Sequence, residues 1–264
     1  MRIDQSADPG VPAQPTAALT DAELYRRGAE TLLASWERYA EGAAGARVWR
    51  SPGVASAVFP DEPERSVYNN ALLKRGLSAG ARSHAIHAME ASYAAVGLTG
   101  YAAWVHESDE AMRADLVVRG YTVDETTRAM GMTLDEMRPS PPAVQLGAPQ
   151  WAEHLRLCGL PTGFLGGIDP KAFHVLVAQL RGENLATAMA LDHAGDCGIY
   201  NVGTLEHARR RGLATALSAL HLHDARTRGC VTASLQSTPM AESLYAAVGF
   251  RDLGHILEFT PPQP

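Results

Sequence analysis

The chain has 264 residues, which is enough for one large domain or two small ones with a sizeable core. Its 46% hydrophobic and 20% charged residues are typical of a globular protein, and a net charge of −6 disfavours binding to nucleic acid or to an anionic membrane. The three cysteines, Cys158, Cys197 and Cys230, lack metal-ligand spacing, so we expect reduced thiols. We find neither a signal peptide nor an apolar run long enough to cross a membrane, and we expect a cytoplasmic protein without a metal.

The first half of the chain alternates predicted helices and strands. Residues 1–19 are rich in proline and poor in bulky apolar residues, so we expect a disordered tail. Thr20-Asp21 then opens a predicted helix that ends near Gly42 or Gly45. After it we expect a hairpin over 48–59, a strand over 66–73, a helix over 81–96, a strand over 101–106, a helix over 109–119 and one or two strands over 121–134.

The run Pro139-Ser140-Pro141-Pro142 is the clearest break in the chain. We interpret residues 139–147 as a linker between a domain over 20–138 and a second over 148–264. Beyond the linker we expect a helix over 149–158, a glycine-rich loop over 159–167, strands over 172–181, 184–192 and 198–204, a helix to about 228, a strand over 230–236, a short helix from Ala241 and a last strand through 259.

The two halves resemble a degenerate repeat. Tyr68-Asn69 recurs as Tyr200-Asn201, and at the same offset Gly80 recurs as Gly212. The order of the predicted elements also matches, which suggests a duplicated domain. The arginines that precede Gly212 have no counterpart before Gly80, so we expect only the second half to bind a nucleotide-type ligand.

The stretch from Gly198 to Leu217 predicts a strand, a basic turn and a helix. Gly212 at the start of the helix lets the backbone approach a ligand closely, and the free N–H groups of a helix N-terminus favour an anion. Arg209, Arg210 and Arg211 add positive charge to that turn. These features predict a cradle for a pyrophosphate group.

This turn, Arg-x-x-Gly-x-Ala over 209–214, resembles motif A of the GCN5-related N-acetyltransferases, or GNAT superfamily, which holds the pyrophosphate of acetyl-CoA. About 30 residues later, the segment 235–250 with Leu244-Tyr245 and Gly249-Phe250 resembles motif B of the same family. The resemblance covers about 172–260. It implies an α/β fold in tandem form: a mixed, V-shaped sheet flanked by helices in each half, with a degenerate N-terminal half.

The resemblance further implies an N-acyltransferase that moves an acetyl group from acetyl-CoA, or another acyl group from its CoA ester, directly to the amine of a small molecule. Tyr245 takes the position of the general acid that protonates the leaving thiolate, and the matching residue of the first half is Leu116. Backbone N–H groups near a strand bulge, for which Gly203 is a plausible residue, bind the oxyanion. The residues implied in binding the cofactor are Val202, Gly203, Thr204, Arg209, Arg210, Arg211, Gly212, Leu213, Ala214 and Thr215.

The acceptor cannot be read from the sequence, and neither can the general base or the oligomeric state. Asn69, Asn201 and Phe164 are candidates to contact the acceptor, and each also has a plain structural interpretation as a core, turn or loop residue. Tyr245 could likewise be a core tyrosine. Two alternative functions stay open: transfer from a carrier-protein or aminoacyl-tRNA donor, and acyl-CoA binding without turnover.

Overall fold

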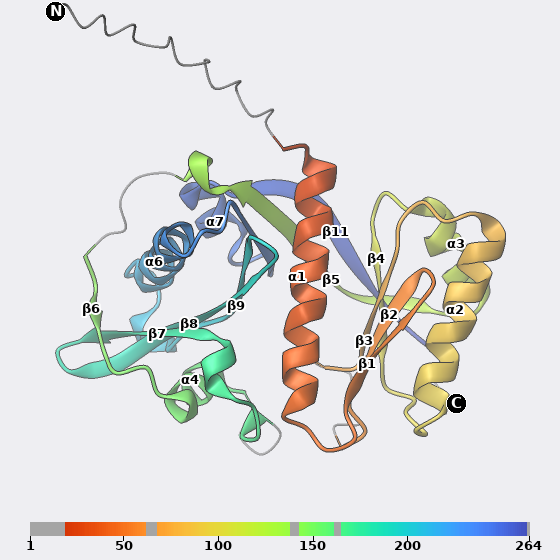
Figure 1. The fold of residues 1–264 in the computed structure, drawn as a ribbon, viewed down its shortest axis with the longest axis horizontal. Helices are drawn as coiled ribbons and strands as arrows, with labels where there is room; N and C mark the ends of the chain where they lie inside the picture. Colours follow the sequence, from red (N-terminus) through yellow and green to blue (C-terminus); the bar gives the residue numbers. More distant parts are fainter. Residues whose placement is uncertain (1–18, 62–67, 138–142, 161–164, 263–264) are drawn as a thin grey trace, which may run out of the picture.

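A single sheet of eleven strands runs through the described part of the molecule (Figure 1). The computed structural model describes residues 19–61, 68–137, 143–160 and 165–262. The strand order is β1-β2-β3-β4-β11-β5-β10-β9-β8-β7-β6. In chain order the strands are β1 (Arg47–Ser51), β2 (Val54–Val58), β3 (Asn70–Leu73), β4 (Ala102–His106), β5 (Thr122–Thr133), β6 (Gln145–Leu146), β7 (His174–Leu180), β8 (Glu183–His193), β9 (Asp196–Thr204), β10 (Thr232–Ser237) and β11 (Arg251–Thr260).

The two halves of the chain exchange strands at the centre of this sheet. β11, the last strand of the second half, lies between β4 and β5 of the first half and is antiparallel to both. β5 in turn is antiparallel to β10, so it lies between two strands of the second half. Each half therefore completes the sheet of the other (Figure 1).

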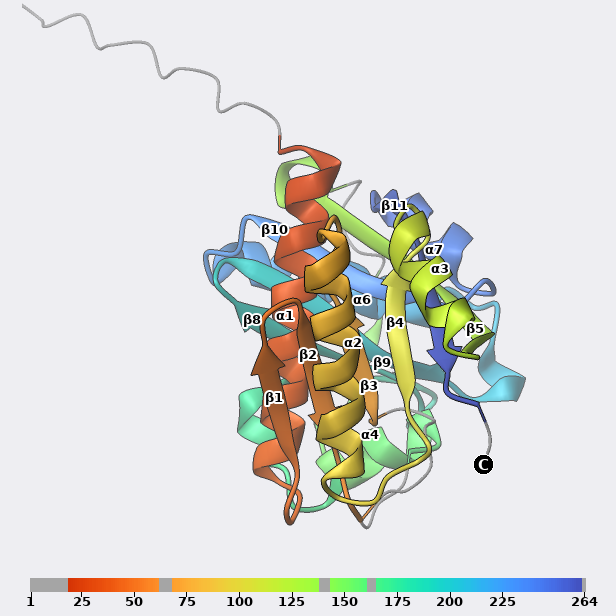
Figure 2. The same ribbon diagram turned by 90° about the vertical axis from the view of Figure 1, so that its right-hand side faces the viewer.

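Helices cover both faces of the sheet. They are α1 (Asp21–Glu41), α2 (Ala79–Ala94), α3 (Glu110–Val118), α4 (Trp151–Cys158), α6 (Leu213–Thr227) and α7 (Glu242–Val248). Helices α1 and α4 share one apolar core on one face, which extends along strands from both halves. On the opposite face α2 and α3 cover the first half, and α6 and α7 cover the second (Figures 1 and 2).

Helix α1 begins and ends where its sequence predicts. The Thr20 hydroxyl caps its first turn by accepting a hydrogen bond from the Glu23 N–H at 3.2 Å. Leu24, Leu32 and Trp36 lie on the stripe that packs against the sheet. As a result α1 runs along the middle of the molecule, over the two exchanged strands and their neighbours (Figure 1).

The order of elements predicted from the sequence agrees with the structure, with local differences. The predicted strand over 66–73 is shorter, because β3 begins at Asn70, and the region over 121–134 holds the single strand β5. The expected linker over 139–147 contains β6, which pairs with Gln179 and Ala178 of β7. The tail over 1–18 and the proline run over 139–142 lie outside the described residues.

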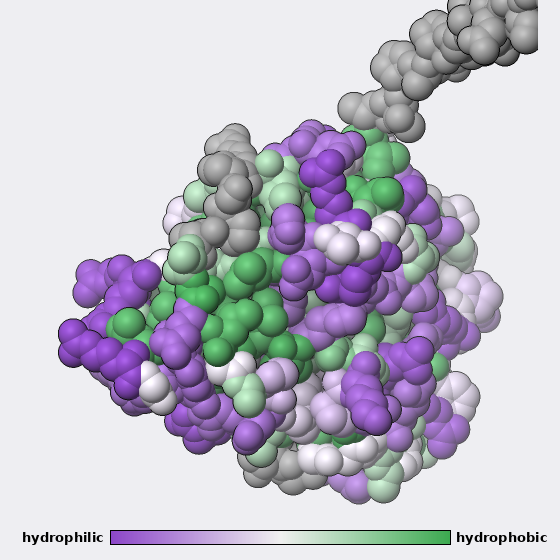
Figure 3. Space-filling model, turned by 60° about the vertical axis from the view of Figure 1, so that its left-hand side comes forward, coloured by the Kyte–Doolittle hydropathy of each residue, from purple (hydrophilic) through white to green (hydrophobic). Residues whose placement is uncertain are grey.

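The far edge of the second half exposes apolar side chains. Leu146 of β6 is 44% exposed and Leu180 of β7 is 38% exposed. Figure 3 shows an apolar patch on this side of the molecule, bordered by polar side chains. β6 and β1 are the two edge strands of the sheet, so this edge is the one further from most strands of the first half.

Candidate active site

A bulge interrupts strand β9 next to β8. Thr187 of β8 pairs with Gly203 of β9, and Met189 of β8 pairs with Tyr200 of β9. The two pairs are thus two residues apart along β8 but three residues apart along β9. The extra residue therefore lies at Asn201 or Val202, and Asn201 has the positive φ of 48° expected at such a distortion. Since the sequence suggested Gly203 for this bulge, that assignment is wrong by one or two residues.

Gly203 has a different reason to be glycine. A Cβ on this residue would lie 2.7 Å from the carbonyl oxygen of Leu157 and 3.0 Å from the Cα of Cys158. The C-terminal end of α4 therefore packs directly on the β9 backbone. In addition, the Cys158 Sγ lies 3.0 Å from the Asn201 carbonyl oxygen and donates to it.

Beyond their first residues, β9 and β10 separate. The parallel pairs join Asp196–Gly198 of β9 to Thr232–Ser234 of β10, yet β9 continues to Thr204 and β10 to Ser237. Among the described residues, the backbone groups on this edge of β9 after Gly198 consequently have no strand partner. In the first half, by contrast, β3 pairs with β4 from Asn70 to Leu72, almost to its end at Leu73.

Where they separate, β9 and β10 form a V, and a buried carboxylate joins the two strands at its closed end. Asp196, 1% exposed, accepts hydrogen bonds from the hydroxyls of Thr232 at 2.7 Å and Ser234 at 2.6 Å. Because these bonds join β9 to β10 through side chains as well as through the backbone, the strands are fixed together where the divergence begins. The open part of the V can then stay apart without loss of register.

A cavity of about 290 Å³ lies in the open part of the V. Its walls come from both faces of the sheet and from both halves of the chain: Leu32, Ser35, Trp36, Tyr39, Trp104, Ile199, Tyr200, Asn201, Val202, Gln236, Ser237, Thr238, Ala241 and Tyr245. Ile199 and Tyr245 belong to the core beneath α6 and α7, whereas Trp36 and Tyr39 belong to the core beneath α1. The cavity thus gives side chains from both faces access to one space between β9 and β10.

Tyr245 enters this cavity from α7. Its side chain is 6% exposed and packs edge-on against Phe250, with ring centroids 5.9 Å apart. Burial raises the pKa of the Tyr245 hydroxyl to about 12. The hydroxyl therefore holds its proton at neutral pH, as a general acid must.

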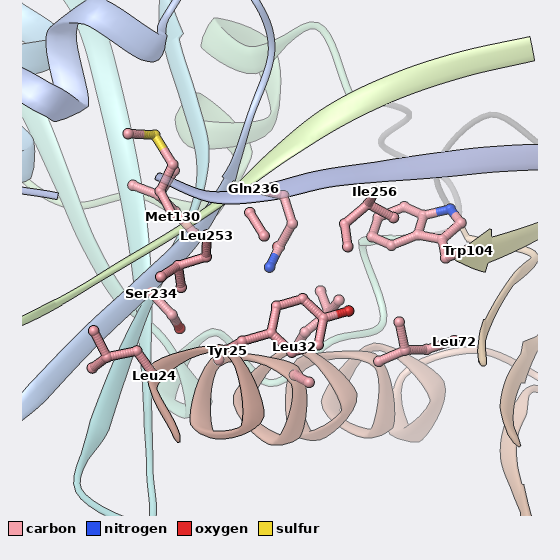
Figure 4. Close-up of a pocket in the computed structure, with 14 residues that line it drawn as sticks. Leu24, Tyr25, Leu32, Leu72, Trp104, Met130, Ser234, Gln236, Leu253 and Ile256 are labelled. Atoms are coloured by element: carbon pink, nitrogen blue, oxygen red, sulfur yellow. The ribbon is translucent and has the colours of Figure 1, made fainter. Parts of the chain in front are cut away.

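A smaller cavity of about 20 Å³ adjoins the first beneath α1 and shares Leu32, Trp104 and Gln236 with it. It is about large enough for one water molecule. Figure 4 shows the Gln236 amide pointing toward α1, with the Tyr25 ring and the aliphatic side chains of Leu32 and Ile256 around it. Gln236 therefore has its polar end in a mainly apolar space.

The basic turn lies between the end of β9 and α6. Arg209, Arg210 and Arg211 are exposed, and Arg209 Nε donates to the Thr204 carbonyl oxygen at 3.3 Å. Two residues of the turn have positive φ, Arg210 at 60° and Gly212 at 76°. No side chain caps the N-terminus of α6, and its first turn has no acidic residue.

This geometry suits an anion such as a pyrophosphate group. The partly exposed first turn of α6, Leu213–Thr215, offers backbone N–H groups beside the three arginines. A Cβ on Gly212 would meet no atom within 4 Å, so the surface there is open to a ligand. Of the other candidates on β9, Val202 lines the cavity, Gly203 packs on α4, and Thr204 pairs with Ala186.

The three candidate acceptor residues lie in different surroundings. Asn201 lines the cavity, and its Nδ2 donates to the Tyr39 hydroxyl at 3.0 Å. Asn69 is fully buried in the first half, where its Oδ1 accepts from the Phe59 N–H at 2.8 Å. Phe164 lies outside the described residues.

The sequence reading did not find the wall of the cavity formed by the first half. Trp36, Tyr39 and Trp104 are not among the candidate site residues of the sequence, and Gln236 enters there only as part of the segment 235–250. The spacing of Trp36 and Tyr39 predicts that they share a face of α1, but only the sheet order places that face against β9 and β10. Among the described residues, no group of three or more His, Cys, Asp or Glu side chains is placed to hold a metal.

Comparison with known families identifies the segment that contains this site. Residues 135–250 match the model of the acetyltransferase (GNAT) family. They form a GNAT domain. The match contains the bulged strand, the basic turn, α6 and α7, and membership in the family supports N-acetyltransferase activity.

Solved structures extend the GNAT fold over nearly the whole chain. A GCN5-related N-acetyltransferase from Kribbella flavida aligns with a TM-score of 0.70 and 18% identity, covering 91% of this chain and 96% of its own. One from Sphaerobacter thermophilus aligns with a TM-score of 0.55 and 17% identity, covering 92% and 93%. At these identities the comparisons show the fold alone. A search of curated proteins gave no match.

In the part of the chain that the structure describes, no helix is both long and apolar enough to cross a membrane.

Proposed function

We propose that the cavity between β9 and β10 is the active site of an N-acetyltransferase that takes its acetyl group from acetyl-CoA and passes it to the amine of a small molecule. The observation that carries this proposal is the early end of pairing between β9 and β10, which leaves a cavity and an unpaired strand edge between the basic turn and Tyr245. A thioester lying in the V would reach N–H donors, the acid and the acceptor space together.

Each part of the site has one task in this proposal. Arg209–Arg211 and the first turn of α6 bind the pyrophosphate, and backbone N–H groups near Val202 and Gly203 stabilise the oxyanion. The amine attacks the thioester carbonyl, the C–S bond breaks, and Tyr245 protonates the departing thiolate.

The cysteines favour direct attack over an acyl-enzyme intermediate. Burial raises the pKa of the Cys158 thiol to about 12, and that of Cys230 also to about 12. The pKa of Cys197 is raised as well by its burial. Since the thiolate is the nucleophile, none of these residues is ready to accept the acetyl group. Reduced thiols also agree with the cytoplasmic location that we propose.

The first half contributes walls rather than a second active site. Its matching strands, β3 and β4, stay paired, and Leu116 of α3 takes the place of Tyr245. Leu116 cannot donate a proton. We therefore propose one catalytic centre per chain, with the degenerate half closing the acceptor side of the cavity through Leu32, Trp36 and Trp104.

The test combines binding with turnover. Acetyl-CoA should raise the melting temperature of the protein, and a thiol reagent should detect CoA release that depends on an added amine. Binding without release for any amine would favour the acyl-CoA-binding alternative. Absence of CoA binding would contradict the proposal and leave a carrier-protein or aminoacyl-tRNA donor.

A further inference from the structure

The described side chains that line the cavity between β9 and β10, here called the acceptor cavity, carry no charge. Among the described residues that line it there is no Asp, Glu, His, Lys or Arg. Its titratable members are three tyrosines, and burial raises the pKa of Tyr39, Tyr200 and Tyr245 above the ordinary value. The described part of the lining therefore stays neutral at physiological pH.

Apart from the three tyrosines, the ionisable groups nearest to the cavity do not line it. Asp196, at the closed end of the V, accepts from Thr232 and Ser234. Glu242, on the helix of Tyr245, pairs with Arg128 at 2.8 Å. On α4, His154 Nδ1 is bonded to Thr187 at 2.8 Å and Cys158 to the Asn201 carbonyl. None of these groups lines the cavity as a base.

An acceptor that arrived as an ammonium ion would meet two obstacles here. Its charge would lose water without gaining a carboxylate partner, which is unfavourable in a partly apolar space. It would also keep the proton that blocks the nitrogen lone pair, because no described side chain in the cavity can remove it. An amine that is already neutral in solution avoids both.

The walls suit a flat, apolar molecule. Trp36 and Trp104 meet edge to face with centroids 5.6 Å apart, and Tyr39 follows Trp36 by one turn of α1. Aromatic walls of this kind favour aromatic ligands. Two polar groups of the lining are available to orient such a ligand: the Gln236 amide, and the Trp104 Nε1–H, which is buried without a hydrogen bond to a described residue.

We infer that the acceptor is an aromatic amine, whose nitrogen is bonded to the ring and is uncharged near neutral pH. This inference rests on the proposed acetyl transfer. The lone pair of the neutral nitrogen attacks the thioester carbonyl and forms the new C–N bond as the C–S bond breaks. The nitrogen gives up one proton and the sulfur takes up one, through Tyr245, so an N-aryl acetamide and CoA leave with no other reactant consumed.

Two isomeric amines test whether the protonation state of the nitrogen decides the rate, because they have the same composition and nearly the same size. 4-Methylaniline is a neutral arylamine at pH 7, whereas benzylamine is mostly protonated. With acetyl-CoA saturating, we expect kcat/KM for 4-methylaniline to be at least about tenfold higher at pH 7. Between about pH 6 and 9, kcat/KM should stay nearly constant for 4-methylaniline, whereas kcat/KM for benzylamine should rise with pH as its free base forms.

A carboxylate placed in the cavity should reverse part of this preference. Gln236→Glu supplies a partner and a base for an ammonium, so the ratio of benzylamine to 4-methylaniline turnover should rise about tenfold or more. Gln145→Glu, on the exposed strand β6, adds the same charge far from the cavity and should leave the ratio unchanged. The melting temperature of each variant, with and without acetyl-CoA, shows whether it is folded.

The outcomes distinguish this inference from the proposed function. If acetyl-CoA binds and benzylamine is the better acceptor, or if acetyl-CoA binds and neither probe is acetylated, the arylamine inference is overturned. The proposed acetyltransferase activity would then have a different class of amine as its acceptor. If acetyl-CoA does not bind the wild-type protein, both fail. A preference for 4-methylaniline that Gln236→Glu reduces supports both, and the wild-type comparison decides even if that variant does not fold.

Discussion

At the scale of single residues, burial sets the protonation states on which both the site and the stability depend. Tyr245 keeps its proton because its hydroxyl loses water on folding, and the cysteines keep theirs for the same reason. The same effect acts in the opposite direction on histidines, since for these residues it is the protonated form that carries charge. Burial lowers the pKa of both His154 and His221 to about 4.

Tyr245→Phe should lower kcat about a hundredfold and leave the KM for acetyl-CoA nearly unchanged, because it removes the proton donor but keeps the ring against Phe250. Steady-state rates with a saturating amine measure this. Tyr25→Phe is the matched control, since the pKa of Tyr25 is also raised to about 12 and it does not line the larger cavity. Undiminished turnover in Tyr245→Phe would remove this residue from the acid role.

The two buried histidines predict an acid-sensitive fold. As pH falls from about 6.5 to 4, His154 and His221 become protonated in the unfolded chain but stay neutral in the folded state. Stability is therefore complete above this window and is lost within it, by up to about 3 kcal/mol per histidine. His154→Gln should make the free energy of unfolding less dependent on pH there, as measured by denaturant titration.

His193→Gln provides the control for that measurement. His193 is exposed at the end of β8, so its replacement makes the same change of side chain outside the core. An equal slope for His154→Gln and the wild type would show that burial of this imidazole does not resist protonation.

At the scale of elements, the sequence predicted what local pattern determines. The helix that opens at Thr20-Asp21 and the hairpin over 48–59 are set by short-range geometry, and the structure has both, with Thr20 capping α1 and Pro52-Gly53 joining β1 to β2. The bulge was misplaced because Gly203 is the obvious candidate from residue type. In the structure Asn201 adopts the positive φ, and Gly203 is required by the approach of α4.

The acceptor walls could not be predicted in the same way. Trp36, Tyr39 and Trp104 become neighbours of β9 and β10 only through the order of strands in the sheet. No periodicity in the sequence encodes a contact between α1 and a strand more than a hundred residues away. The cofactor side, by contrast, is built from one continuous strand, turn and helix, which is why its motif is visible in the sequence.

The two glycines that border α6 allow a matched test of the cofactor side. Gly212 and Gly229 both have positive φ, 76° and 95°, and a Cβ on either would meet no atom within 4 Å. Alanine at either position should therefore cost about 1 kcal/mol of stability through backbone strain alone. Only Gly212→Ala should also weaken acetyl-CoA binding, because it adds a methyl group and strain at the N-terminus that we propose binds the pyrophosphate.

Calorimetric titration with CoA and thermal melting measure the two effects separately. Equal losses of CoA affinity in Gly212→Ala and Gly229→Ala would mean that the effect is general to α6. The pyrophosphate would then have to bind elsewhere.

At the scale of the whole molecule, the exchange of β5 and β11 makes the two halves depend on each other. β11 pairs with β4 and β5 over long runs, and it carries Leu253 and Ile256 into the core beneath α1. Removal of the second half would leave β4 and β5 without the strand that lies between them. Removal of the first half would leave β10 without β5 and would uncover the face of the sheet that α1 covers.

The fragments 1–138 and 139–264 should therefore not fold when they are expressed separately. Each would expose strand edges that pair in the intact chain, and exposed edges of this kind favour aggregation. Co-expression should restore a soluble one-to-one complex, because both exchanged strands are then present. Size-exclusion chromatography and circular dichroism of each fragment, alone and together, measure this. A monomeric fragment with a cooperative unfolding transition would mean that its half carries a complete sheet and core, and that the exchange joins two domains already stable by themselves.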